Sequence, residues 1–167
     1  QGTITMEFPH LFRLIEEKQF DTIYHEHFSY FSFLTVEKIF SAHGLTLFDV
    51  EELSTHGGSL RIYARHTEDK SRPVAERVNQ LRQEEMEAGY LDIRHYLGFQ
   101  EKVKAVKKDI LKFLIRAKED GKSIVGHGAP AKGNTLLNYC GIRTDLIDYT
   151  VDRSPYKQGH YLPGSHI

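Results

Sequence analysis

The chain has 167 residues, of which 40% are hydrophobic and 27% are charged, enough to bury a core in one domain or two small ones. The formal charge of −1 at pH 7 gives no sign of a nucleic-acid or membrane-surface binder. Its one cysteine, Cys140, excludes an intrachain disulfide and a thiolate zinc site within the chain. No apolar run approaches the roughly 18 residues that span a bilayer, and no secretory signal is visible, so we expect a cytoplasmic protein.

The sequence opens with a predicted strand and two predicted helices. Residues 1–9 read as a strand, and residues 10–18 read as a short helix because apolar residues recur there at helical spacing. Thr35 is predicted to cap a second helix, which ends just before Gly44. Its apolar face is expected to comprise Val36, Ile39 and Phe40.

A pair of strands follows the second helix. Residues 45–53 alternate well enough for a strand, with an irregularity at Phe48, and residues 59–65 alternate strictly. The turn at 55–58 contains Gly-Gly and joins them, so an antiparallel pair is expected. In the second strand one face carries Leu60, Ile62 and Ala64, and the other carries Arg61, Tyr63 and Arg65.

The composition changes at Thr67, where a polar linker leads into a helical stretch at 74–118. Gly89 and Gly98 interrupt this stretch, so two helices are predicted. The second is a long amphipathic helix, because apolar residues repeat at steps of three and four: Val103, Val106, Ile110 and Leu114.

After Gly121 the sequence alternates between strand and helix. A strand at 123–126, a helix at 131–139 and a strand at 146–151 form a βαβ unit, which is typical of a parallel sheet covered by helices. The fold class is therefore α/β. Because one βαβ unit is too little for a doubly wound sheet, we expect a fragment: the end of one α/β domain, a helical connection, and the start of another. These three parts are predicted at 1–70, 71–120 and 121–167.

Four consecutive titratable residues, Tyr24, His25, Glu26 and His27, lie between apolar neighbours. An imidazole can take or give a proton at neutral pH, a carboxylate can orient it, and a phenol can donate to an oxyanion. In an extended segment Tyr24 and Glu26 would share one side, whereas in a helix Tyr24 and His27 would share a face. An aromatic loop with satisfied histidines is the simpler alternative. A zinc site would need further ligands that the sequence does not place, so no metal is predicted.

A second motif follows the first strand of the βαβ unit. The segment 126–131 matches G-x-G-x-x-A between a strand and a helix, a context that allows a phosphate at the helix N-terminus. Gly128 lies in the loop, and Lys132 and Asn134 lie in the first helical turn, where a lysine opposes the helix dipole but suits a phosphate. The alternative is NAD(P), with Asp152 on a ribose.

Other polar positions are weaker candidates for substrate binding. His56 and Gly57 lie in a turn whose amides can approach a ligand, although a plain hairpin turn is the favoured explanation. Arg61 on the polar strand face can meet a phosphate. Arg153 and Lys157 follow the last strand and are expected to line the crevice at its carboxyl end, or else simply to be solvated.

Four long motifs carry a family resemblance: FDTIYHEHFSYFS, HGLTLFDVEELSTHGGSLRIYARH, GHGAPAKGNTLLNYCGI and YTVDRSPYKQGHYLPGSHI. Together they resemble the sugar C-methyltransferases, which transfer a methyl group from S-adenosylmethionine to C3 of a nucleotide-linked 4-keto deoxysugar. The resemblance implies a zinc-binding N-terminal domain, a class I methyltransferase core and a Rossmann-like C-terminal domain. This chain is similar to the end of the core and the start of the C-terminal domain.

The resemblance also implies roles for particular residues. His27 would be the base that removes the C3 proton to give an enolate, supported by Tyr24 and Glu26. The residues near the nucleotide sugar would be His56, Gly57, Arg61, Gly128, Lys132, Asn134, Arg153 and Lys157. The glycine-rich S-adenosylmethionine loop and the zinc cysteines would lie in parts that this chain lacks. Nothing in the resemblance gives the oligomeric state.

Three functions are therefore weighed. The first is a methyltransferase fragment acting on a nucleotide sugar. The second is a Rossmann-like module that binds NAD(P) or a sugar nucleotide without chemistry. The third is an inactive remnant or a scaffold in a polysaccharide gene system.

Overall fold

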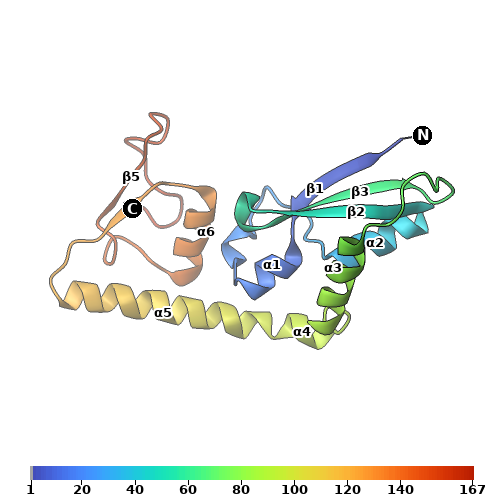
Figure 1. The fold of residues 1–167 in the computed structure, drawn as a ribbon. Coiled ribbons are helices and arrows are strands. Elements are labelled where there is room, and N and C mark those ends of the chain that lie inside the picture. Colours follow the sequence, from blue (N-terminus) through green and yellow to red (C-terminus); the bar gives the residue numbers. More distant parts are fainter. Residues whose placement is uncertain (1) are drawn as a thin grey trace. The chain divides into compact units, whose positions relative to one another are not determined.

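The computed structural model describes residues 2–167, which divide into two compact units. Unit 1 consists of residues 2–19 and Phe28–Phe99, and unit 2 consists of Phe20–His27 and Gln100–Ile167. The short segment Phe20–His27 thus belongs with the C-terminal part of the chain, although the residues on both sides of it belong to unit 1. Figure 1 gives the elements of both units in chain order.

Unit 1 is built on a three-stranded antiparallel sheet in the order β1-β3-β2. Its strands are β1 (Ile4–Pro9), β2 (Leu45–Leu53) and β3 (Ser59–His66). The predicted antiparallel pair of β2 and β3 is confirmed, and the opening strand joins the free edge of β3. The register of β2 shifts between Leu47 and Asp49, so Phe48 is the extra residue of a bulge, which explains the broken alternation in the sequence.

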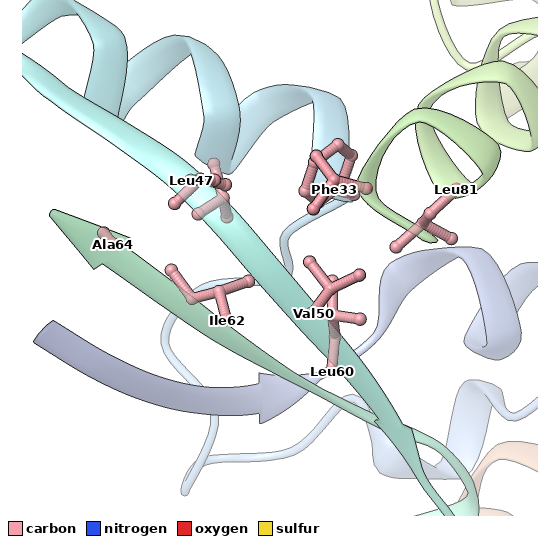
Figure 2. Close-up of a cluster of buried hydrophobic side chains, with 9 residues drawn as sticks. Phe33, Leu47, Val50, Leu60, Ile62, Ala64 and Leu81 are labelled. Atoms are coloured by element: carbon pink, nitrogen blue, oxygen red, sulfur yellow. The ribbon is translucent and has the colours of Figure 1, made fainter. Parts of the chain in front are cut away.

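The apolar face of this sheet is covered by α2 (Phe33–Ala42) and α3 (Glu76–Glu87). Figure 2 shows Phe33 of α2 and Leu81 of α3 close to the buried side chains of β2 and β3. The alternate β3 residues predicted to face the core, Leu60, Ile62 and Ala64, are all fully buried. The remaining buried members of this core are Val36, Leu47, Val50 and Val78.

The start and the face of α2 differ from the prediction in two details. Ser32, not Thr35, is the N-cap, because its side chain accepts a hydrogen bond from the Thr35 amide at 3.2 Å. Val36 is buried, but Ile39 is 43% exposed, because the helix leans on the sheet along a narrower stripe than the sequence indicated. Gly44, with a φ of 68°, follows the helix end as expected.

The region predicted as two helices contains three, α3, α4 (Ile93–Leu97) and α5 (Phe99–Glu119). Gly89, just past the end of α3, has a φ of 91°, which does not continue the helix. The Asp92 carboxylate then accepts the Arg94 amide at 2.9 Å, which starts the extra helix α4. The short helix α1 spans Leu11–Glu16, and single 3₁₀ turns span Phe20–Thr22 and Thr55–Gly57.

Unit 2 contains the predicted βαβ arrangement. Strands β4 (Val125–His127) and β5 (Tyr149–Val151) are parallel and joined by α6 (Ala131–Cys140). Both strands begin later than predicted. Before β4 the Ile124 amide donates to the Asp148 carboxylate, and before β5 the chain forms a turn in which the Leu146 and Ile147 amides donate to the Arg143 carbonyl. The core of this unit is formed by Leu114, Cys140, Ile142 and Ile167.

The molecule is therefore of mixed α/β class, with an antiparallel sheet in one unit and a small parallel pair in the other. The division into parts at 1–70, 71–120 and 121–167 stays a prediction. Within residues 2–167, no helix has the length and apolar character required to cross a membrane.

Candidate functional site

The segment Tyr24–His27 forms a tight turn, which is neither of the two regular conformations considered from the sequence. The His27 amide donates to the Tyr24 carbonyl at 3.0 Å, which closes the turn. The Tyr24 hydroxyl donates to Glu26 Oε2 at 3.0 Å, and the Tyr24 ring lies 4.9 Å from the His27 ring. The Tyr24 side chain therefore contacts both Glu26 and His27.

The hydrogen bond of the His27 ring defines which of its nitrogens can accept a proton. His27 Nδ1 lies 3.0 Å from the carbonyl oxygen of Thr22, and a carbonyl only accepts. Nδ1 therefore carries the hydrogen, and in the neutral ring the lone pair is on Nε2. His27 and Tyr24 are partly buried, whereas His25 and Glu26 are exposed.

The turn is attached to unit 2 through the residues before it. Phe20 packs against Tyr139 near the end of α6, with 4.9 Å between ring centroids. Thr22, which holds the His27 ring, is buried. The apolar neighbours of the turn are unusually exposed: Phe28 is 96% exposed and Ile23 is 47% exposed.

At the carboxyl ends of β4 and β5, Asp152 ties two loops together. Its Oδ2 accepts from the Ala129 amide at 2.7 Å and its Oδ1 accepts from the Ser154 amide at 2.8 Å. These backbone hydrogen bonds lower the pKa of Asp152 below its ordinary value. Lys157 Nζ lies 3.6 Å from the same carboxylate and donates to the Ala129 carbonyl at 2.8 Å. The loops after the two strands are thus fixed before any ligand arrives.

A pocket of about 520 Å³ lies beside these hydrogen-bonded loops. Its lining includes Asp152 and Lys157 together with the final loop of the chain, which contributes Tyr156, His160 and Tyr161. Sequence reasoning missed these last three residues, since scattered aromatic residues in a polar loop carry no spacing signal. Arg153 lines a neighbouring hollow with His127 and Gly128.

The predicted phosphate loop uses part of its hydrogen-bonding capacity internally. The Gly128 amide donates to the Val151 carbonyl at 2.7 Å, and the Ala129 amide is held by Asp152. Gly128 has a φ of 88°, as a glycine allows. Lys132 and Asn134 lie in the first turn of α6, so their positions agree with the prediction while their role stays untested.

The remaining predicted residues belong to unit 1. His56 and Gly57 both have positive φ, and a side chain at Gly57 would meet Gln19 at 2.9 Å. The side-chain amide of Gln19 donates to the Gly57 carbonyl at 2.5 Å, so a residue that follows α1 supports this turn. Arg61 lies between two carboxylates, with Glu7 Oε2 at 2.9 Å and Glu51 Oε2 at 3.4 Å. An incoming phosphate would compete with both.

Among residues 2–167 no cluster of histidine, cysteine and acidic side chains is arranged to hold a metal ion. The predicted site residues therefore form three groups. Two lie in unit 2, around the Tyr24–His27 turn and around the ends of β4 and β5, and the third lies beside the turn before β3 in unit 1.

Two comparisons with known proteins show the family to which the chain belongs. Residues 54–167 match the family described as "C-methyltransferase C-terminal domain", so the chain belongs to this family. The chain is also similar to C-methyltransferase NovU of Streptomyces niveus, with 37% identity over 168 residues that cover 99% of this chain. It spans 39% of the length of that relative. The sequence-based recognition of a C-methyltransferase, from its C-terminal portion, is confirmed.

Proposed function

We propose that the protein to which this chain belongs transfers a methyl group from S-adenosylmethionine to C3 of a nucleotide-linked 4-keto deoxysugar. Membership of the C-methyltransferase family supports the transfer to carbon. The observation that carries the mechanism is the Tyr24–His27 turn, which presents an imidazole with its lone pair on Nε2. The methyl donor is a substrate, and this chain is assigned only the proton transfer and the binding of the sugar nucleotide.

His27 is the proposed general base. A proton on C3 is acidified by the neighbouring C4 ketone. His27 Nε2 accepts this proton, and the electrons of the C–H bond form the C3–C4 double bond of an enolate, with the negative charge on oxygen. The nucleophilic C3 then attacks the sulfonium methyl group. The new C–C bond forms as the methyl–sulfur bond breaks, S-adenosylhomocysteine leaves, and the C4 ketone is restored. A positioned base typically contributes about 10²–10⁴-fold to the rate.

Tyr24 and Glu26 orient the base in this proposal. The Tyr24 hydroxyl has one hydrogen, which is donated to Glu26 in the structure. A hydrogen bond from Tyr24 to the enolate oxygen would therefore need this contact to open. The ring of Tyr24 packs against that of His27 in either case, so it limits the rotation of the imidazole.

The nucleotide part of the substrate is assigned to the ends of β4 and β5. Since the amides of Gly128 and Ala129 are already used, a phosphate would rely on the first turn of α6 and on the positive charge of Lys132. The NAD(P) alternative has less support, because both carboxylate oxygens of Asp152 already accept backbone amides. Isothermal calorimetry with a TDP-sugar and with NAD would separate these ligands.

The decisive test replaces the base in the full-length protein. His27→Gln removes the ring nitrogen but keeps a polar side chain, and we expect turnover to fall by at least 100-fold while S-adenosylmethionine binds as before. His25→Gln is the matched control, since His25 is exposed and has no assigned role. Turnover within threefold of wild type in the His27 variant would remove His27 from the mechanism.

A further inference from the structure

A buried histidine–glutamate pair lies in unit 1, and neither of its residues has been given a role above. The side chains of His10 and Glu85 are both 0% exposed, and His10 Nε2 lies 2.7 Å from Glu85 Oε1. Charged residues are almost never fully buried unless they are paired. His10 Nδ1 has no hydrogen-bond partner among residues 2–167, and its nearest acid is Glu52, with Oε1 at 3.7 Å. Burial of two titratable side chains costs free energy, so we looked for the parts of the chain that the pair connects.

Glu85 holds the start of α2 as well as His10. Its Oε1 accepts from the Phe33 amide at 2.7 Å, and its Oε2 accepts from the Leu34 amide at 2.9 Å. These are the first two amides of the helix, which have no partner within it and attract negative charge. Figure 2 shows Phe33 at the beginning of α2, beside the helix that carries Glu85.

The backbone at His10 also contacts the residues that precede α2. It forms an isolated bridge with Phe31, and the Leu11 amide donates to the Phe31 carbonyl at 3.0 Å. The His10 amide itself donates to the Gly58 carbonyl at 3.0 Å. The pair thus joins the residues just before α1 to the residues that lead into α2.

The segment between these two points carries the Tyr24–His27 turn. The chain leaves His10 through α1, passes through residues 20–27, and returns to the pair at Phe31 and Phe33. A loop whose ends are held together has fewer conformations than one whose ends are free. Restraint at both ends therefore reduces the number of conformations open to the segment that carries His27.

We propose that His10 and Glu85 are positioning residues for His27, acting by fixing both ends of the segment that carries it. The inference rests on the proposed function, because it assigns the pair a part in the same proton transfer. His10 donates from Nε2, Glu85 accepts, and the two first amides of α2 complete the closure. Loss of His10 or Glu85 frees the end of the segment where it enters α2.

The test compares variants of the full-length enzyme. Glu85→Gln keeps the size of the side chain but replaces one acceptor oxygen with a donor, which opposes an α2 amide. We expect kcat to fall at least tenfold with little change in the Kd for S-adenosylmethionine. Amide hydrogen exchange at residues 22–28 should rise at least tenfold. His10→Gln retains a donor and is expected to keep more of the turnover than His10→Leu.

A matched control separates positioning from loss of stability. Val78 lies on the same helix as Glu85 and is fully buried, so Val78→Ala should destabilise unit 1 while it removes none of the hydrogen bonds of the pair. We expect it to leave kcat and the exchange of residues 22–28 close to wild type at temperatures where it is folded. If Glu85→Gln does not fold, the comparison of His10→Gln with His10→Leu carries the same test.

Two results would overturn the inference. One is unchanged exchange at residues 22–28 in folded variants of the pair, and the other is an equal loss of turnover in Val78→Ala. The proposed function fails differently: a wild-type protein without methyl transfer, or an active His27 variant, would refute it, whereas the exchange measurement does not depend on activity.

Discussion

Replacing Glu85 with leucine should destabilise unit 1 strongly, even though it puts an apolar residue of similar size into a core. Three donors lose their acceptor: the His10 ring and the amides of Phe33 and Leu34. Each buried group left unsatisfied costs about 1–3 kcal/mol, so the low end of the sum is about 3 kcal/mol. This agrees with the ~3–5 kcal/mol seen when one partner of a buried ion pair is removed.

Urea unfolding followed by far-UV circular dichroism measures this change in the free energy of unfolding. With a slope of about 1–3 kcal/mol per molar urea, a loss of 3 kcal/mol lowers the midpoint by about 1–3 M. Glu84→Leu is the control, because Glu84 is adjacent, is half exposed and lies 3.7 Å from Arg13, and such surface pairs contribute only about 0–1 kcal/mol.

The double variant His10→Leu/Glu85→Leu sharpens the reasoning. It removes both members of the pair, so no buried charge is left alone, and its cost should be smaller than the sum of the two single changes. It should still be less stable than wild type, because the α2 amides remain without an acceptor. A Glu85→Leu protein within 1 kcal/mol of wild type, or strictly additive costs, would refute this account of the pair.

Three further predictions concern local contacts. The pKa of Asp148 is lowered to about 2, chiefly by its hydrogen bond with Lys118. Its contribution to the stability of the fold is therefore complete above the ordinary pKa of an aspartate, about 3.9, and is lost as the pH falls through about 2. The stability difference between wild type and Asp148→Asn should therefore shrink from pH 5 to pH 2 in thermal melts, and a constant difference would contradict the assignment. Gly126→Ala should lower the melting temperature, because its new methyl group would run into the Thr150 side chain, and Thr150→Ala in the same chain should restore part of the loss. Ser32→Ala removes the N-cap of α2 and should lower the free energy of unfolding, measured in urea, by about 1 kcal/mol. If Thr35 were the cap, this change would have no effect.

Local patterns predicted most of the secondary structure. The bounds of β2 are those expected at 45–53, and the alternation of β3 predicted its buried face correctly, because one face of an antiparallel sheet meets the core and the other meets water. The βαβ order of unit 2 agrees with the prediction, although both strands start later than expected. The cap of α2 was misplaced by three residues, since Ser32 and Thr35 are both good caps and only the geometry distinguishes them.

Long-range contacts were beyond the reach of the sequence. Glu85 lies in a run of glutamates and glutamines that is typical of a solvated helix face. It is nevertheless fully buried and is paired with His10, 75 positions away. The attachment of β1 to β3 likewise joins residues 50 to 60 positions apart. In the candidate site, the residue types at 24–27 indicated proton chemistry, but the contact of Tyr24 with both Glu26 and His27 required a turn that neither periodicity predicted.

The membership of Phe20–His27 in unit 2 has a consequence for recombining this protein with its relatives. A chimera made with a single crossover near residue 100 would take unit 2 from one parent but residues 20–27 from the other. The ring of Phe20 would then meet a foreign counterpart of Tyr139. A chimera that keeps unit 2 intact therefore needs two blocks transferred together, the eight-residue segment 20–27 and the C-terminal segment, with the junctions at 19/20, 27/28 and 99/100.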